Sequence, residues 1–477
     1  MIDPLSFASK ESMDATLSKQ REAFLKSPAT TIRKRKADLK KLKAAILAYR
    51  EPLKAAVSED FGYRSSHETD VLEFFGIIQS IDYMIKNLRK FMKREHRHVG
   101  LFFRAGKTYV DYLPKGVIGI MAPWNYPLSL TLIPLATALA AGNRAMVKPS
   151  ELTPRTSNLI KQLIEGVFEP EEVAVIIGGA DVGAEFSRQS FDHLLFTGST
   201  TVGHKVMKAA SDNLVPLTLE LGGKSPTVIA KGQVKQKTMQ RLVFGKLSNG
   251  GQTCVAPDYS LIHEQDLDTF VTQFSDTVSK FYPDGPTGKD YTSIVNDRHK
   301  QRLIGLIEDA RHRGAKIVEA GLLPESANDR IRTIAPTLVI NPDDNSAIMR
   351  EEIFGPLLPV KTYRTMQEAI DYINARPRPL ALYYFGEKDS DCKKLLSNTT
   401  SGNVGINNTL MHVAQDDLPF GGIGPSGMGA YHGIEGFKSM SHAKGTYEQS
   451  YWNFADLLRA PFGKFADIAL KLTLGKK

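Results

Sequence analysis

The sequence has only two cysteines, Cys254 and Cys392, among 477 residues. Two thiols cannot form a disulfide framework, so a reducing compartment is indicated. Long apolar runs are also missing: the longest, Leu128 to Ala141, is interrupted by Pro134 and is too short to span a bilayer. The amino-terminal residues lack the apolar segment of a secretory signal. We therefore expect a cytoplasmic protein.

The charge balance is basic, with 61 Lys and Arg against 52 Asp and Glu and a net charge of +9. Such a chain can bind nucleic acid, an anionic membrane or a phosphate-bearing cofactor. The densest basic block, residues 33–43, also carries Leu39 and Leu42, which with Ile46 follow the spacing of one buried helix face. No zinc finger, basic zipper or RNP motif accompanies this block. We therefore expect a solvated helix and no nucleic-acid partner.

The order of the predicted elements indicates an α/β fold. Residues 1–95 are predicted to be mainly helical, and an aromatic stretch at 97–112 favours a pair of strands. Short apolar strands then alternate with helical segments, which predicts a doubly wound parallel sheet; these strands are expected at 117–121, 145–147, 173–177 and 193–196. A second alternating region begins near Thr227, with a helix at 239–247 and strands at 259–263 and 337–340. The glycine-rich segment from Phe420 to Gly433 is predicted to be a tight loop.

Three side chains have the chemistry of acyl transfer. Cys254 follows the sequence Asn249-Gly250-Gly251-Gln252-Thr253, whose glycines permit a sharp turn beside free amide groups. Such amides lower the pKa of a thiol and bind an oxyanion, so a nucleophile is predicted rather than a buried structural cysteine. Glu220 ends a predicted strand and is followed by two glycines, the position where open α/β sheets build their sites. Asn125 also follows a strand and can donate its amide to an oxyanion, the alternative being an Asx turn between prolines.

Two further segments suit a nucleotide. Residues 196–203, FTGSTTVG, run from a strand end into a helix start, where amides bind phosphates. They do not match the regular G-x-G-x-x-G fingerprint. Lys148 and Glu151, at another strand end, offer a cation and a carboxylate to ribose hydroxyls. No His or Cys spacing typical of a metal site occurs, and we expect no metal.

Seven segments occur in an order that resembles the aldehyde dehydrogenase superfamily: PWNYP, KPSE, FTGSTTVG, LELGGKSP, GQTCVAPDY, EEIFGP and PFGGIGPSGMG. The resemblance covers nearly the whole chain. The compact length and the ending GMGAYHGIEGFKSMSHAKG are similar to the class 3 branch, which includes fatty-aldehyde and coniferyl-aldehyde dehydrogenases, and MHVAQDDLPFGG is most similar to the coniferyl type. The resemblance implies NAD-dependent oxidation of an aldehyde to its acid, with NADP as a possible cofactor.

The resemblance also assigns roles to residues. It implies that Cys254 is the nucleophile, that Glu220 activates water, and that Asn125 and the Cys254 amide form an oxyanion hole. It implies a cofactor-binding set comprising Lys148, Glu151, Gly198, Ser199, Gly203, Glu352 and Phe354. Tyr126 and Phe420 are expected to line the substrate pocket. Where many relatives carry a Glu after the last glycine run, this chain has Tyr431, so no proton relay through that Glu is implied.

The family architecture implies the division of the chain. We expect an NAD-binding domain (1–95 and 115–221), a catalytic domain (222–440), a β oligomerisation arm (96–114 and 441–450) and a tail (451–477), assembled as a homodimer. In the tail, Phe465, Ile468, Ala469 and Leu472 share one helical face. We expect this face to dock on the dimer; the alternative is a peripheral contact with anionic lipid.

Several functions remain open at this point. The substrate is expected to be aromatic, of the cinnamyl type such as coniferyl aldehyde, or apolar, with medium- or long-chain fatty aldehydes as the alternative. A cofactor-free cysteine hydrolase would use Cys254 and Glu220 but would not need KPSE or FTGST. A basic membrane-surface protein would need none of the three catalytic candidates. A CoA-acylating enzyme is disfavoured by a water-activating Glu220.

Overall fold

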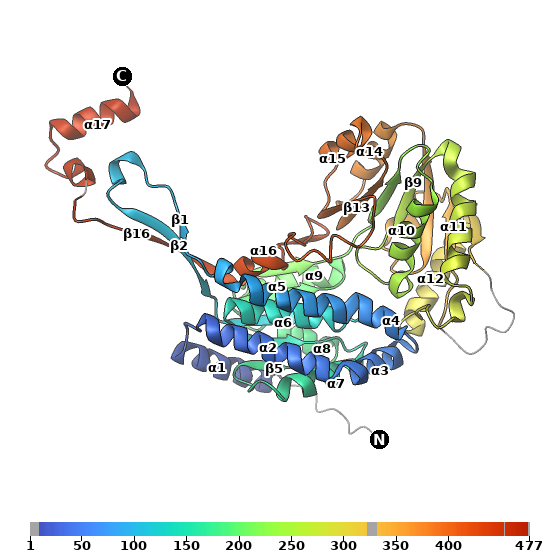
Figure 1. The fold of residues 1–477 in the computed structure, drawn as a ribbon, viewed down its shortest axis with the longest axis horizontal. Coiled ribbons are helices and arrows are strands. Elements are labelled where there is room, and N and C mark those ends of the chain that lie inside the picture. Colours follow the sequence, from blue (N-terminus) through green and yellow to red (C-terminus); the bar gives the residue numbers. More distant parts are fainter. Residues whose placement is uncertain (1–8, 322–331, 453, 476–477) are drawn as a thin grey trace.

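The computed structural model describes residues 9–321, 332–452 and 454–475. Within them the strands form a six-stranded, a seven-stranded and a three-stranded sheet. The first two lie in the body of the molecule, and the third forms an arm that projects from it (Figure 1). The predicted α/β class is confirmed.

The six-stranded sheet has the order β15-β7-β6-β3-β4-β5, and all neighbours are parallel except β15. Its strands are β3 (Val117–Met121), β4 (Arg144–Lys148), β5 (Val173–Val175), β6 (His193–Thr197), β7 (Leu217–Glu220) and β15 (Gly427–Met428). The four strands predicted in this region are therefore confirmed. β15 belongs to the glycine-rich loop and pairs with the last residue of β7, Glu220. The loop thus closes the edge of the first sheet.

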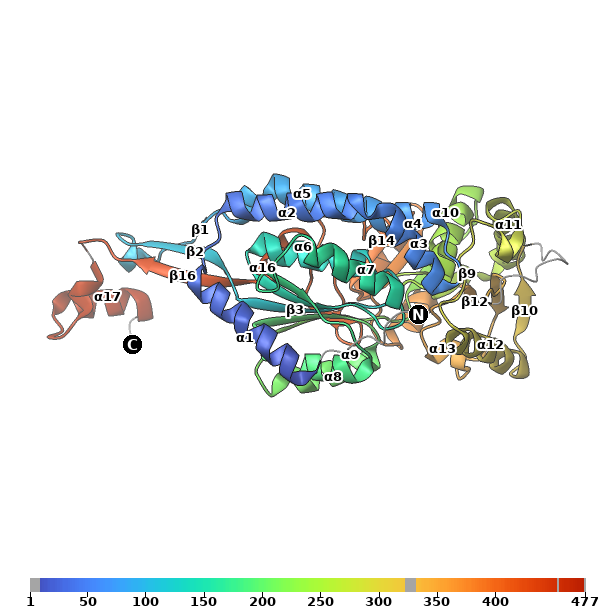
Figure 2. The same ribbon diagram turned by 90° about the horizontal axis from the view of Figure 1, so that it is seen from below.

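Helices cover both faces of this sheet. Figure 2 shows α6 and α7 on one face, with α2 and α5 outside them, and α8 and α9 on the other. The bounds are α1 (Lys10–Lys26), α2 (Ile32–Ala48), α3 (Arg50–Phe61), α5 (Phe75–Phe91), α6 (Ser129–Ala141), α7 (Pro154–Glu165), α8 (Ala180–Ser187), α9 (Thr200–Ser211) and α16 (Gly433–Ser439). In the basic helix α2, Leu39, Leu42 and Ile46 are fully buried, as their spacing predicts.

The seven-stranded sheet has the order β10-β11-β12-β9-β8-β13-β14 and is parallel except for β10. Its strands are β8 (Pro226–Ile229), β9 (Tyr259–His263), β10 (Lys316–Glu319), β11 (Thr337–Ile340), β12 (Leu357–Tyr363), β13 (Ala381–Phe385) and β14 (Asn403–Ile406). Its helices are α10 (Gln236–Leu247), α11 (Leu267–Phe281), α12 (Asp297–His312), α13 (Ala347–Arg350), α14 (Met366–Asn374) and α15 (Ser390–Asn398).

The arm is the antiparallel sheet β1 (Glu95–His96), β2 (Lys107–Pro114) and β16 (Ser441–Glu448). The tail helix α17 (Lys464–Leu474) lies at its far end (Figure 1). The helix was predicted; on its predicted apolar face Ala469 is buried, whereas Ile468 is 57% and Leu472 80% exposed.

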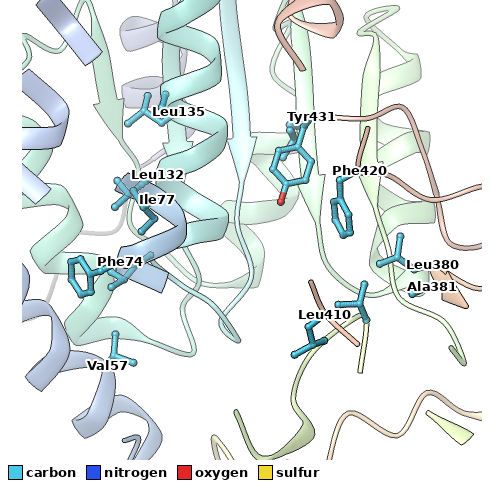
Figure 3. Close-up of a cluster of buried hydrophobic side chains, with 14 of the residues drawn as sticks. Val57, Phe74, Ile77, Leu132, Leu135, Leu380, Ala381, Leu410, Phe420 and Tyr431 are labelled. Carbon is cyan, nitrogen blue, oxygen red and sulfur yellow. The ribbon is translucent and has the colours of Figure 1, made fainter. Parts of the chain in front are cut away.

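The main hydrophobic core extends from the helices of the first sheet to the second sheet. Figure 3 shows Ile77, Leu132 and Leu135 between helices, and Phe420 and Tyr431 on loops beside them. Continuous packing of this kind holds the two sheets in a defined relation. Among the helices of the described ranges, none combines the length and the apolar character needed to cross a membrane.

Candidate active site

The site begins at the carboxyl ends of the parallel strands of the first sheet. Lys148 ends β4, Thr197 ends β6 and Glu220 ends β7, while Asn125 lies in the loop after β3. The register pairs Thr197 directly with Glu220. Because these ends meet at one edge, residues far apart in the sequence converge there.

The loop that carries Cys254 has an unusual backbone. Asn249, Gly250 and Gly251 all have positive φ, between 55° and 76°. A Cβ on Gly251 would lie 2.3 Å from the Gly355 carbonyl oxygen, so glycine is required there for both conformation and space. This turn follows α10 directly and delivers Cys254 to the edge of the first sheet.

Buried hydrogen bonds fix this loop. The Gln252 side chain donates to the carbonyls of Asn249 (2.8 Å) and Ser293 (3.0 Å) and accepts from the Val295 amide (3.0 Å). Since Gln252 is fully buried, each of these bonds is shielded from water. The loop is thereby held to the segment that precedes α12.

Asn125 lies against the same loop. Its Nδ2 atom donates to the Gln252 carbonyl at 3.1 Å, and its own carbonyl accepts from Asn249 Nδ2 at 2.8 Å. The next residue, Tyr126, shares a 2.7 Å hydrogen bond with the Thr253 hydroxyl. The structure thus brings Asn125 and the loop of Cys254 together.

Two cavities meet at Cys254. The first, of about 220 Å³, is lined by Asn125, Gly198, Ser199, Glu220, Cys254, Glu352 and Phe354, together with Trp124 and other residues. The second, of about 290 Å³, is lined mainly by apolar side chains and includes Tyr126, Cys254, Phe420, Tyr431 and His432. The partly exposed Cys254 is therefore open to both.

The pKa of the Cys254 thiol is raised, although a lowered value was expected. Burial raises the pKa of the thiol to about 12, and the charges of Glu352 and Glu220 add to this effect. Hydrogen bonds from the backbone amides of Cys254 and Val255 act in the opposite direction but are weaker. The amides lower the thiol pKa as expected, but desolvation outweighs them, so the net shift is upward. Nucleophilic attack therefore requires a base or a change in the surroundings.

Glu220 is 3% exposed, and neither carboxylate oxygen has a hydrogen-bond partner among the described residues. Burial raises its pKa well above the usual value for Glu. Buried polar atoms normally find partners, and an unpaired carboxyl group in a cavity suits a role with a water molecule or substrate. Its backbone is fixed by β15 through the Gly427–Glu220 pair.

Glu352 is the second unusual carboxyl group. Burial and the charge of Asp258 raise its pKa to about 8, and its Oε1 atom is buried without a hydrogen-bond partner in the described part of the chain. A Cβ on Gly222 would lie 2.0 Å from Glu352 Oε2, so this glycine leaves room for the carboxyl group. An unpaired carboxyl oxygen at the cavity wall fits the hydroxyls of a nucleotide ribose. The residues present therefore fit NAD(P).

Phe354 adopts a positive φ of 52°, a strained conformation for a non-glycine residue that is common at binding sites. Its ring meets Trp124 edge to face at 5.4 Å. Ser199 caps α9 by accepting a hydrogen bond from the Val202 amide at 3.4 Å. Gly203, inside α9, does not line the cavity; a Cβ there would lie 2.7 Å from Leu221.

Lys148 and Glu151 lie outside both cavities. Lys148 is buried and forms a 3.1 Å ion pair with Glu151, whose side chain is 42% exposed. The Lys148 ammonium also donates to the Pro149 carbonyl at 3.2 Å. These two residues therefore form a separate polar pair at the end of β4.

Sequence reasoning missed several residues of the site. His299 and Arg302, on α12, line the first cavity, and the pattern of that helix gives no signal of this role. Lys224 lies in the recognised LELGGKSP segment; its ammonium bonds to Asp258 and to the carbonyls of Ile348 and Glu351 (both 2.8 Å). The Ile353 amide donates to Asp258 at 2.9 Å. This network positions the segment that carries Glu352.

In the second cavity Phe420 and His432 stack at 5.1 Å, and Tyr431 meets Phe420 edge to face at 5.9 Å. Both ring nitrogens of His432 are buried without a partner among the described residues, and burial lowers its pKa to about 4. Tyr431 is 2% exposed; burial raises its pKa well above the usual value, and the charges of Glu220 and Cys254 add to this effect. The wall is thus aromatic, with neutral polar groups.

Comparisons with known proteins agree with this arrangement. The model of the aldehyde dehydrogenase family matches residues 2–446. The chain is 49% identical over 387 residues to a probable coniferyl aldehyde dehydrogenase of Pseudomonas aeruginosa, covering 81% of this chain and 80% of that protein.

Solved structures agree as well. The substrate-bound structure of Staphylococcus aureus AldH has a TM-score of 0.90 at 38% identity, over 96% of this chain and 99% of that one. A Mycobacterium tuberculosis aldehyde dehydrogenase complexed with NAD+ has a TM-score of 0.84 at 27% identity, over 94% and 92%. The chain therefore belongs to the aldehyde dehydrogenase family and is an NAD(P)-dependent oxidoreductase.

Proposed function

We propose that this enzyme oxidises an aromatic aldehyde of the cinnamyl type to its carboxylic acid through a thioester on Cys254. The observation that carries the proposal is the position of the thiol, where a cavity lined by Glu352 and Gly198 meets an aromatic cavity. Glu220 lines the first cavity with an unpaired carboxyl group. A nucleophile, a base and two binding spaces are thus present at one point.

In the first step the Cys254 thiolate adds to the aldehyde carbon, and the C=O bond becomes an oxyanion. Asn125 Nδ2 and the Cys254 backbone amide are the donors for that oxyanion. Asn125 is held for this role by its contacts with Gln252 and Asn249. Because the thiol pKa is about 12, Glu220 is the nearby group suited to accept the thiol proton.

When bound, NAD supplies the acceptor for the hydride that leaves the aldehyde carbon. Cys254 then carries the acyl group as a thioester. Glu220 passes the thiol proton to solvent and then takes a proton from water, while the water oxygen attacks the carbonyl carbon. The carbon–sulfur bond breaks, and Glu220 returns its proton to the departing thiolate. The carboxylic acid departs and the thiol is restored. The high pKa of Glu220 suits it to both proton transfers.

The cofactor residues follow the same proposal. Glu352 would bind one ribose, Gly198 and Ser199 would approach the pyrophosphate, and Lys148 with Glu151 would bind the adenosine ribose. The carboxylate of Glu151 repels a 2′-phosphate, so we expect a preference for NAD over NADP. The ion pair with Lys148 at 3.1 Å moderates that repulsion. Equal kcat/KM for the two cofactors would contradict this assignment.

The second cavity supports an aromatic substrate. Its walls are mainly apolar, and Ser80 donates a hydrogen bond to Asp416 at the lining. These polar groups, with the unpaired nitrogens of His432, could bind the hydroxyl of a phenolic aldehyde. The relative from Pseudomonas aeruginosa is named a probable coniferyl aldehyde dehydrogenase, and coniferyl aldehyde is a phenolic aldehyde of this type. The apolar walls also suit a fatty aldehyde, which is the second candidate.

We also propose a homodimer formed through the arm. In the described part of the chain β16 pairs on one side only, with β2, and most of its eight residues are exposed. A long open edge strand is a template for pairing with another chain. The exposed apolar residues of α17 at the end of the arm support the same conclusion. The arm (96–114 and 441–450) would then be a separate oligomerisation unit beside the NAD-binding and catalytic domains.

The test is a comparison of cinnamyl-type, phenolic and straight-chain aldehydes by kcat/KM, followed through absorbance of reduced NAD. We expect the highest value for a phenolic cinnamyl aldehyde. A higher value for long-chain aldehydes would favour the second candidate. No absorbance change with any aldehyde would contradict the proposed function itself.

A further inference from the structure

The short helix α4 (Ser66–Thr69) carries a partly buried carboxylate, that of Glu68, which the reaction steps above do not use. Ser65 caps this helix by accepting a hydrogen bond from the Glu68 amide at 3.4 Å. The spacing of Ser65 and Glu68 resembles a capping box, in which Glu would bond back to its own helix. Instead, the Glu68 carboxylate reaches the nucleophile loop: Oε1 accepts from the Asn249 amide at 2.8 Å. Its other oxygen, Oε2, accepts from the Thr292 hydroxyl at 2.5 Å.

The Asn249 amide is a critical point of attachment. Asn249 begins the run of three left-handed residues that leads to Cys254. Its side chain donates to the carbonyls of Asn125 (2.8 Å) and Gln252 (3.1 Å). Glu68 therefore holds the residue that joins both parts of the oxyanion hole.

Through its hydrogen bond to Glu68, Thr292 connects a third segment of the chain to α4 and the loop of Cys254. The neighbouring Ser293 carbonyl accepts from Gln252 Nε2 at 3.0 Å, and a Cβ on Gly250 would lie 2.9 Å from the Thr292 carbonyl oxygen. The segment of Thr292 is thus packed directly on the nucleophile loop. One carboxylate connects the loop, this segment and α4.

The charge makes these bonds strong. Hydrogen bonds to an ionised acceptor are about twice as strong as neutral ones. Burial raises the Glu68 pKa, while the charge of Arg64 and the bonds from Thr292 and Asn249 lower it. Arg64 in turn forms a 2.8 Å buried ion pair with Glu73, which accepts from the amides of Leu128 and Ser129. The net shift of the Glu68 pKa is upward, and these polar partners partly offset the effect of burial on the carboxylate.

We propose that Glu68, assisted by Thr292, is a positioning residue that holds Asn249 and hence the oxyanion donors in their reactive geometry. Glu68 touches neither substrate nor cofactor in this account, because it lies in neither cavity lining. The inference rests on the proposed function, since it concerns the step in which the oxyanion forms.

The test measures the rapid first release of reduced NAD after mixing enzyme, NAD and aldehyde. In Glu68→Ala both bonds are lost, and we expect this burst to slow about 10- to 100-fold, since small misplacements of reacting groups have effects of this size. Glu68→Gln keeps an acceptor for Asn249 and should retain most of the rate. The aldehyde KM and the NAD dissociation constant should stay within about twofold, because donors to an oxyanion act in the transition state.

Glu59→Ala is the matched control. Glu59 lies on the neighbouring α3 and its side chain is 60% exposed in an ion pair with Arg155. We expect no change in its burst. A Glu68→Ala enzyme with a lowered melting temperature but a normal burst would show that Glu68 is only structural and would overturn the inference.

Thr292 provides a second route if Glu68→Ala does not fold. Thr292→Val removes one of the two bonds at nearly constant volume, and we expect a burst about 3- to 10-fold slower. Thr292→Ser keeps the hydroxyl and should behave like the wild type. Equal bursts in Val and Ser variants would overturn the inference. Failure of the wild type to form any reduced NAD would instead contradict the proposed function.

Discussion

Replacing Glu220 by Gln should separate the two halves of the reaction. The substitution keeps the size of the side chain but removes the carboxylate that we propose activates water. Cys254 can still be acylated, so about one equivalent of reduced NAD per active site should appear, followed by slow turnover. Loss of a general base costs about 10²- to 10⁴-fold, which is the expected fall in steady-state rate.

The structure also predicts how pH affects this variant. Glu220 contributes to the high pKa of Cys254, about 12, so its removal favours the thiolate. If Glu220 also accepts the thiol proton, the burst of the variant slows and then recovers as pH rises. Far below the thiol pKa the thiolate fraction grows about tenfold per pH unit. Between pH 7 and 9 the burst should therefore accelerate by up to about 100-fold, while turnover stays slow.

In the wild type the raised pKa of Glu220 determines whether kcat rises or falls with pH. Below that pKa the group is protonated and cannot act as a base, so kcat should rise with pH as the carboxylate forms. The Gln variant should lack this dependence. Rapid-mixing absorbance measures both phases. A Glu220→Gln enzyme with normal steady turnover would refute the role of Glu220 in hydrolysis.

Three further predictions address the cofactor, stability and tail. Gly222→Ala should displace the Glu352 carboxyl group, because its Cβ would lie 2.0 Å from Oε2. NAD affinity measured by calorimetry should therefore fall about tenfold. The control Gly305→Ala, which has open space around the new Cβ, should bind NAD normally. Glu73→Ala removes the ion-pair partner of the buried Arg64 and should lower the free energy of unfolding by about 3–5 kcal/mol in urea titrations. Asp111→Ala, in the exposed pair with Arg94, should lose less than about 1 kcal/mol, and equal losses would contradict the reasoning. Truncation after Tyr451 should weaken dimerisation in sedimentation experiments, because it removes the exposed apolar face of α17; vesicle binding by the full chain that disappears on truncation would favour the lipid alternative instead.

Much of the fold could be predicted from local patterns. β3 and β9 begin and end where their apolar runs do, because a buried parallel strand needs apolar residues on both faces. The position of Glu220 at a strand end followed from the same reasoning. The glycines of the segment before Cys254 predicted a sharp turn, and the backbone there does adopt positive φ.

Other features depend on tertiary packing and left no local signal. The sequence around Cys254 shows nearby amides, but it does not show how far burial raises the thiol pKa. The spacing of Ser65 and Glu68 suggests a helix cap, yet the carboxylate bonds to Asn249, 181 residues away. The sequence indicated the apolar face of α17, but it could not show which other surface covers that face. Each of these depends on contacts between distant segments.

The central claim is that the acyl group is carried by Cys254. The most direct measurement is intact mass spectrometry of Glu220→Gln enzyme quenched during the burst, with peptide mapping of the product. The account predicts an added mass equal to the acyl group of the aldehyde, located on the peptide of Cys254 and absent from Cys254→Ala. A full burst of reduced NAD with no adduct on Cys254 would contradict it.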